Sequence, residues 1–234
     1  NDPFYRFATS QTWASLALVE AAPATARGLR AFVDATPMPQ FATIVVDDAC
    51  VAPTSDDVLP FYFLNISDAE LADPRAGLPD WTTRVNSLDR DHLTQYVRDI
   101  AIEANETAGD TTPWTETALA KRIERVDVGC RTFADELAHL EENLVGEFDG
   151  VAMLLIDIEG VDCDFVATSA EAIVAALTTR GPALLVYERY HCGGDSRLDA
   201  ERSLAEAVAD VPGYEMECRE DIDRVNIYCL FQPR

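Results

Sequence analysis

Residues 153–165 read MLLIDIEGVDCDF, a short apolar run followed directly by acids. The apolar residues 153–156 are typical of a strand that is buried on both faces, as in a parallel sheet. The acids that follow are Asp157, Glu159, Asp162 and Asp164. Two interpretations are open: the strand comes out into solvent, or its end forms the floor of a functional site.

Strands and helices alternate on both sides of this stretch. Apolar runs bounded by turn residues predict strands, and apolar residues at helical spacing predict helices. The predicted strands are residues 14–20, 41–51, 58–66, 123–129, 150–160, 182–191, 214–220 and 224–234. The predicted helices are residues 22–35, 89–109, 130–146, 169–181 and 196–213. Ser196 is the predicted N-cap of the last helix.

This alternation predicts an α/β fold, a Rossmann-like sheet with helices on both faces, because fully apolar strands between helices are typical of parallel sheets. The last two strands are joined by a short turn, so they must form an antiparallel hairpin. Pro60 indicates an edge or hairpin strand for residues 58–66. Residues 65–125 are polar and mostly helix-forming, which predicts a helical insertion within a single domain spanning residues 1–234.

The composition excludes several classes of partner. The chain has 234 residues and a formal net charge of −24, from 42 acidic and 18 basic residues. A surface this acidic repels the phosphates of nucleic acids and of anionic membranes. No stretch reaches the roughly 20 apolar residues of a membrane span. We therefore expect a folded protein that binds neither nucleic acid nor membrane.

The six cysteines show no C-x-x-C spacing and the chain has only three histidines, so no metal site is expected. Cys50, Cys218 and Cys229 fall in predicted strands, where buried thiols are common. Free thiols indicate a reducing compartment, and we therefore expect a cytoplasmic protein. The alternative is the secretory pathway, which the N-x-S/T triplets at Asn65 and Asn105 would suit.

Three parts of the sequence carry a family resemblance. The first is LALVEAAPATARGLRAFV (16–33), in which an acid and a short proline-containing loop precede a helix. The second is ATIVVDDACVAPTSDDVLPFYF (42–63), a strand, an acidic turn and an aromatic strand. The third combines CRTFADEL (130–137), DGVAMLLIDIEGVDCDFV (149–166) and PALLVYERYH (182–191). Together they resemble the FkbM-type class I S-adenosylmethionine-dependent methyltransferases, which have K-I-D-V-E-G-A-E in the third part.

The chain also departs from the family pattern. In the third part, Leu155 replaces the lysine, and Val161 and Asp162 replace the alanine and the last glutamate. The family's first strand and its glycine loop, D-V-G-A-N-x-G, should precede Glu20 by about one helix. Asn1 and Asp2 match only the end of that loop, and Pro3 stands where a glycine is usual. The resemblance implies that the first strand lies upstream of Asn1, or that half of the cofactor site has been lost.

The resemblance implies S-adenosylmethionine as the cofactor and a hydroxyl of a sugar, glycan or small metabolite as the methyl acceptor. In open α/β sheets the ligand binds beyond the carboxyl ends of the strands. Glu20, after the first predicted strand, would accept hydrogen bonds from both ribose hydroxyls. Asp48 would accept one from the adenine amino group, and Asp2 would line the same loop. The alternative for each is an acid in a solvated loop.

Asp157, Glu159, Glu188 and His191 are the predicted catalytic residues. Two neighbouring parallel strands end near them, so their side chains should converge on one cleft with Glu20 at its other end. Asp157 would face the sulfonium or the acceptor, and Glu159 would orient the acceptor or act as the base. His191 would accept a proton near neutral pH. The alternative is that Asp157 caps the following turn and that Glu159 and His191 are exposed.

Other aromatic residues have simpler expectations. His92 and His139 lie on predicted helices and are expected at the surface. Trp13, Trp81 and Trp114 are expected to pack the insertion on the core. Trp81 could instead line the mouth of the acceptor site, since insertions in this fold usually shape acceptor choice.

Two functions compete with the methyltransferase. One is a catalytically inactive relative that keeps the fold as a structural or assembly subunit, which the incomplete glycine loop would suit. The other is a nucleotide-linked oxidoreductase, because an acid after the second strand of such a sheet also suits a dinucleotide ribose. The closing hairpin and the D-I-E-G stretch speak against the oxidoreductase.

Overall fold

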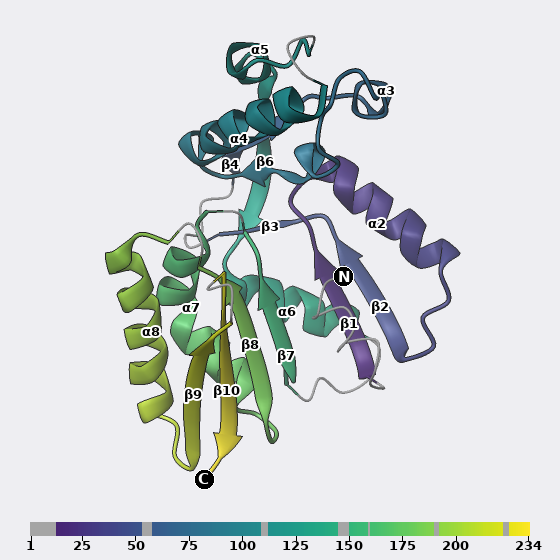
Figure 1. Ribbon diagram of the computed structural model, residues 1–234. Helices are drawn as coiled ribbons and strands as arrows, with labels where there is room; N and C mark the ends of the chain where they lie inside the picture. Colours follow the sequence, from purple (N-terminus) through teal and green to yellow (C-terminus); the bar gives the residue numbers. More distant parts are fainter. Residues whose placement is uncertain are drawn as a thin grey trace.

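The computed structural model describes residues 13–52, 58–108, 112–144, 150–158, 160–189, 192–221 and 225–234. The protein is a mixed α/β structure whose described strands form three hydrogen-bonded sheets (Figure 1). Two of the sheets occupy the lower part of Figure 1, and the third extends from them to a group of helices at the top.

The first sheet has two parallel strands and a connecting helix: β1 (Trp13–Val19), α2 (Pro23–Ala35) and β2 (Phe41–Asp47). Pro23 begins the helix, where its fixed φ fits and its missing N–H leaves no bond unmade. β1 ends one residue before Glu20, whose backbone N–H still donates to the carbonyl of Asp47. Acids therefore stand at the carboxyl ends of both strands, as predicted.

The second sheet has four strands in the spatial order β7 (Met153–Ile156), β8 (Ala183–Glu188), β10 (Asn226–Pro233) and β9 (Tyr214–Glu220). β7 and β8 are parallel and are joined by helix α7 (Asp162–Leu177). β10 is antiparallel to both β8 and β9, so the sheet ends in an antiparallel pair. Helix α8 (Gly194–Ala209) follows β8 and begins two residues before Ser196, so Ser196 is not its N-cap.

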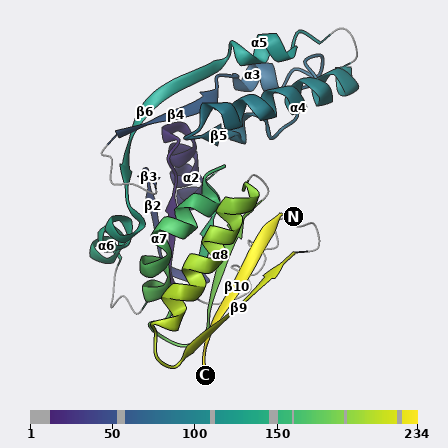
Figure 2. The same cartoon turned by 90° about the vertical axis from the view of Figure 1, so that its left-hand side faces the viewer.

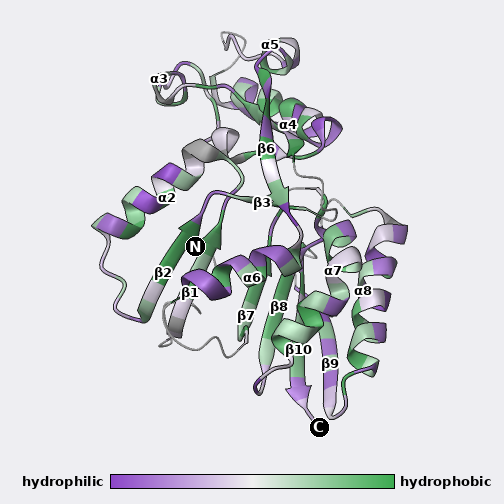
Figure 3. Cartoon of the chain, turned by 180° about the vertical axis from the view of Figure 1, so that it is seen from behind, coloured by the Kyte–Doolittle hydropathy of each residue, from purple (hydrophilic) through white to green (hydrophobic). Residues whose placement is uncertain are grey.

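Described helices cover only one face of this second sheet. α6 (Phe133–Asn143), α7 and α8 lie on the same side of it (Figure 2), and Figure 3 views the molecule from that side. Burial along β10 alternates accordingly: Ile227, Cys229 and Phe231 are at most 1% exposed, whereas Leu230 is 39% exposed. For this sheet, the expectation of helices on both faces is wrong within the described residues.

The third sheet has the order β3 (Cys50–Val51), β6 (Ile123–Arg131), β4 (Val58–Leu64) and β5 (Asn86–Ser87). β4 pairs antiparallel with β6 along its whole length, and β5 pairs with Tyr62 and Phe63 of β4. β4 therefore lies between two strands at Tyr62 and Phe63, so the edge or hairpin strand that Pro60 indicated describes only the part of β4 around Pro60. Pro60 is tolerated because β5 pairs only beyond it, so its single described partner is Asp127 of β6.

Between β4 and β6 the chain is mostly helical, as predicted, and contains α3 (Asp68–Leu71), the 3₁₀ turn η1 (Thr82–Arg84), α4 (Arg90–Ala108) and α5 (Glu116–Ala120). The short strand β5 was not predicted. α4 buries four apolar residues at helical spacing: Leu93, Val97, Ile100 and Ala104. Trp114 is buried with them, and Trp81 packs against the same cluster. The insertion thus has a hydrophobic cluster of its own, and a single domain over residues 1–234 stays a prediction.

All six cysteines form disulfides: Cys50–Cys130, Cys163–Cys192 and Cys218–Cys229. The first joins β3 to β6 and the third joins β9 to β10, in each case between residues that face each other in the sheet. The second joins the start of α7 to the segment after β8. The expectation of free buried thiols is therefore wrong, and the inference of a reducing compartment loses its basis.

Candidate functional site

The parallel strands β7 and β8 bring two predicted catalytic residues to one edge of the sheet. Ile156 of β7 pairs with Tyr187 of β8, and Asp157 and Glu188 are the next residues along the two strands. Asp157 is exposed, and Glu188 is partly buried. Because parallel neighbours end on the same side, these two acids belong to the same edge.

Three other predicted site residues, Asp2, Glu159 and His191, lie outside the described residues. A single cleft that runs from Glu188 to Glu20 therefore stays a prediction. Two hollows in the described surface lie elsewhere. One of about 320 Å³ lies between α7 and α8, and one of about 220 Å³ lies between α2 and β2.

Asp162, the first residue of α7, organises the turn that follows β7. Its carboxylate accepts the backbone N–H groups of Ile158, over 2.9 Å, and Gly160, over 3.3 Å. Asp162 is 3% exposed. This burial raises the pKa of Asp162 to about 7, and the charge of Asp157 contributes in the same direction. Sequence reasoning gave Asp162 no role, although an aspartate at the start of a helix is a common local acceptor of backbone N–H groups.

The Cys163–Cys192 disulfide fixes the same edge. Cys163 directly follows Asp162, and Cys192 comes four residues after the end of β8. The backbone N–H of Cys192 also donates to the carbonyl of Arg189 over 2.9 Å. The turn after β7 and the segment after β8 are therefore covalently joined, which holds the ends of the two strands together.

His92, from helix α4 of the insertion, covers the turn after β7. Gly160 has a φ of +96°, and a Cβ at this position would lie 2.5 Å from Nδ1 and 2.6 Å from Cγ of His92. His92 is 4% exposed, and its ring packs edge-on against Tyr96 with centroids 5.1 Å apart. The expectation that His92 is a surface residue is wrong. Its spacing of four residues from Tyr96 and eight from Ile100 was the available signal, because these positions share one helix face.

The side chain of Glu20 makes a hydrogen bond to the backbone at the start of α2. Its Oε1 accepts the backbone N–H of Ala22 over 2.7 Å. Burial raises the pKa of Glu20 above its usual value, although the hydrogen bond from Ala22 opposes that shift. A carboxylate has acceptor capacity beyond one N–H, so this arrangement is compatible with the predicted contact to a ribose.

Asp48 forms an ion pair with Arg30 of α2. The Nη1–Oδ2 distance is 3.2 Å, and the side chains of Arg30 and Asp48 are 40% and 48% exposed. The hydrogen bond from Arg30 lowers the pKa of Asp48 below its usual value. Asp48 is therefore a charged acid at the end of β2, with a cation of its own chain beside it.

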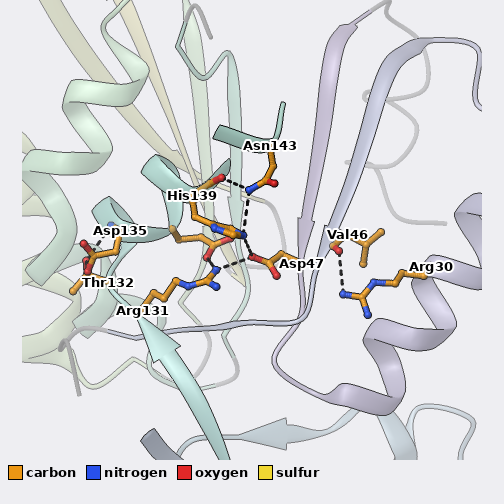
Figure 4. A network of polar contacts seen from close by, with 9 residues as sticks. Arg30, Val46, Asp47, Arg131, Thr132, Asp135, His139 and Asn143 are labelled. Carbon is orange, nitrogen blue, oxygen red and sulfur yellow. Dashed lines mark hydrogen bonds and ion pairs between the residues drawn. The ribbon is translucent and has the colours of Figure 1, made fainter. Parts of the chain in front are cut away.

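Asp47, the last residue of β2, belongs to a network that was not predicted (Figure 4). Arg131 Nη1 lies 2.7 Å from Asp47 Oδ2 and 2.7 Å from Glu136 Oε2, and His139 Nε2 lies 3.2 Å from Asp47 Oδ2. Glu136 is 3% exposed, and its Oε1 has no hydrogen-bond partner among the described residues. Burial raises the pKa of Glu136, although Arg131 opposes the shift. The side chain of His139 is 40% exposed, so His139 lies at the surface as expected, and it also contacts Asp47 of β2.

The described residues include no group of three or more His, Cys, Asp or Glu that could hold a metal ion. Within the same residues, no helix combines the length and the apolar character that crossing a membrane requires. The described acids of the candidate site, Glu20, Asp48, Asp157 and Glu188, favour cationic groups and hydrogen-bond donors as ligands.

Comparison with known proteins adds no family assignment. No family model and no curated protein matches the chain. Among solved structures, an O-methyltransferase from Bacillus cereus in complex with SAH is 11% identical over 100% of this chain and 82% of its own, with a TM-score of 0.36. Cofactor-bound Rv0187 from MTB is 13% identical over 72% of this chain and 91% of its own, with a TM-score of 0.28. TM-scores this low do not establish a shared fold, so function has to be inferred from the residues of this chain.

Proposed function

We propose that the protein binds S-adenosylmethionine beyond the carboxyl ends of its parallel strands and methylates a hydroxyl of a sugar, glycan or small metabolite. The observation that carries this proposal is the placement of Asp157 and Glu188, the residues directly after Ile156 and Tyr187, which form the last pair between β7 and β8. This edge is where open α/β sheets bind ligands. The resemblance of residues 149–166 to the FkbM-type motif supports the same assignment.

Glu20, Asp48 and Asp2 are the residues proposed to hold the cofactor. Glu20 is already half-buried and fixed by Ala22, so little side-chain freedom would be lost when its remaining acceptor sites take the ribose hydroxyls. Asp48 would accept from the adenine amino group while it stays near Arg30. The cofactor supplies an electrophilic methyl group on a cationic sulfur, and the acids of this edge favour that charge.

Asp157, Glu159, Glu188 and His191 are the residues proposed to act on the acceptor. Asp157 would face the cationic centre or the acceptor, and Glu188 would lie beside it. Glu159 or His191 would take the proton of the acceptor hydroxyl, whose oxygen becomes a better nucleophile as the proton leaves. Holding the hydroxyl in line with the methyl group would supply much of the remaining acceleration.

Methyl transfer can be tested directly with methyl-tritiated S-adenosylmethionine and a panel of sugars, oligosaccharides and small alcohols. We expect label in at least one acceptor with the wild-type protein, and about 100-fold less with Asp157→Asn, because misplacing the reacting groups has effects of this size. Glu215→Gln, on the exposed strand β9, is the matched control and should keep wild-type activity. Equal labelling by wild type and Asp157→Asn would remove Asp157 from the site.

A catalytically inactive structural or assembly subunit is the second candidate. The observation that favours it is that both acids at the end of β2 already pair with arginines of the chain, Asp47 with Arg131 and Asp48 with Arg30. Such a protein would fold cooperatively but bind no S-adenosylmethionine. Absence of both binding and labelling in a well-folded sample would favour this candidate.

The three disulfides indicate the kind of cellular compartment in which the protein folds. Three disulfides in one chain are typical of proteins from oxidising environments. We therefore propose the secretory alternative in place of a cytoplasmic location. Mass spectrometry after alkylation without reductant tests this: protein from its native source should carry no alkylated cysteine, and six alkylated cysteines would contradict it.

A further inference from the structure

We infer that His92 is a positioning residue for the candidate site: it holds the turn after β7 in place and so sets the position of Asp157. The inference rests on the proposed function. The first observation that supports the inference is the close approach of Gly160 to His92. A Cβ atom added to Gly160 would lie 2.5–2.9 Å from three atoms of the His92 ring. The backbone of the turn therefore lies directly against the ring, three residues after Asp157.

The ring of His92 cannot easily move aside. Tyr96 packs edge-on against it, and Trp81 packs against Tyr96 with centroids 6.1 Å apart. Leu93, the next residue of α4, is fully buried in the cluster of the insertion. The position of His92 is thus determined by the insertion and not by the sheet.

The opposite side of the turn is held by the start of α7. Asp162 accepts the N–H groups of Ile158 and Gly160, and the adjacent Cys163 is linked to Cys192. The turn is therefore clamped between α7 and the insertion. A shift of α4 would move Gly160 and, through it, Asp157, which makes the insertion a determinant of how the acceptor is placed.

Hydrogen exchange of the backbone amides of Ile158 and Gly160 tests the positioning without any ligand. His92→Ala should raise their exchange rates at least about tenfold, because the turn loses one side of its clamp. His92→Phe keeps a flat ring and should restore most of the protection. Ile102→Ala, at a position of α4 that is 48% exposed, is the matched control and should change neither rate. Unchanged exchange in His92→Ala would overturn the inference.

Transfer of the tritiated methyl group to the acceptor found with the wild-type protein separates positioning for function from mere packing. We expect His92→Ala to lower the rate of methyl transfer about tenfold or more, and His92→Phe to return it to near the wild-type rate. Equal rates in wild type and His92→Ala would overturn the functional part. If wild type itself transfers no methyl group, the proposed function fails, and the hydrogen-exchange experiment alone then tests whether His92 holds the turn.

Discussion

Arg131 donates a hydrogen bond through Nη1 to Asp47 Oδ2 over 2.7 Å, joining the end of β6 to the end of β2. No backbone ladder links the β1–β2 sheet to either of the other sheets in the described residues. The same nitrogen of Arg131 also reaches the buried carboxylate of Glu136. One guanidinium therefore pairs with two acids and ties the first sheet to the rest of the molecule.

Arg131→Met should lower the free energy of unfolding by about 3–5 kcal/mol, because it leaves the carboxylate of Glu136 buried without its cation. The measurement is urea unfolding at neutral pH. Arg125→Met is the matched control, since the Arg125–Asp127 pair is 57% and 55% exposed and should contribute no more than about 1 kcal/mol. Equal losses from the two substitutions would show that the network does not stabilise the fold.

Asp162 should make stability depend on pH. Its folded-state pKa is raised from 3.8 to about 7, so the folded protein holds this proton more tightly than the unfolded chain does. The resulting stabilisation is complete below the unfolded pKa and is lost as the pH rises through about 7. Relative to Asp162→Asn, the wild-type free energy of unfolding should fall by about 1.4 kcal/mol per pH unit within this window. Urea titrations at several pH values measure it, and parallel pH profiles for the two proteins would contradict it.

Removal of the Cys163–Cys192 disulfide should destabilise the protein by about 3–4 kcal/mol, because it closes a loop with a sequence separation of 29. The double substitution Cys163→Ser/Cys192→Ser should also increase proteolysis around residues 157–162. Cys218→Ser/Cys229→Ser is the control, since this disulfide spans only 11 residues within an antiparallel pair and should contribute less. A larger loss in the control would contradict the assigned role of Cys163–Cys192.

The local sequence pattern was enough to predict which acids follow the strands β1 and β7. β1 ends before Glu20 and β7 ends before Asp157, because in both places an apolar run meets an acid and a turn. The buried face of α4 follows equally from its apolar spacing. The burial of His92 could have been read from its spacing to Tyr96, and the Cys218–Cys229 link from the register of the predicted hairpin.

Contacts between distant segments could not be predicted. Arg131 and Asp47 are 84 residues apart, and no local spacing indicates that β6 brings one beside the other. The Cys50–Cys130 disulfide could not be predicted for the same reason, because its two cysteines come together only when β3 and β6 are neighbours in the sheet. The face of the second sheet that no described helix covers was also unpredictable, since apolar strand residues indicate burial without saying which element covers them.

The central claim is that the carboxyl edge binds S-adenosylmethionine with Glu20 on the ribose. Calorimetric titration of S-adenosylhomocysteine into wild type, Glu20→Ala and the control Glu215→Ala tests it most directly. We predict one site per chain in wild type, unchanged binding in Glu215→Ala, and a loss of about 1–3 kcal/mol in Glu20→Ala, the usual effect of deleting a charged hydrogen-bond partner. No binding to wild type at millimolar ligand, or equal affinities for wild type and Glu20→Ala, would contradict the claim.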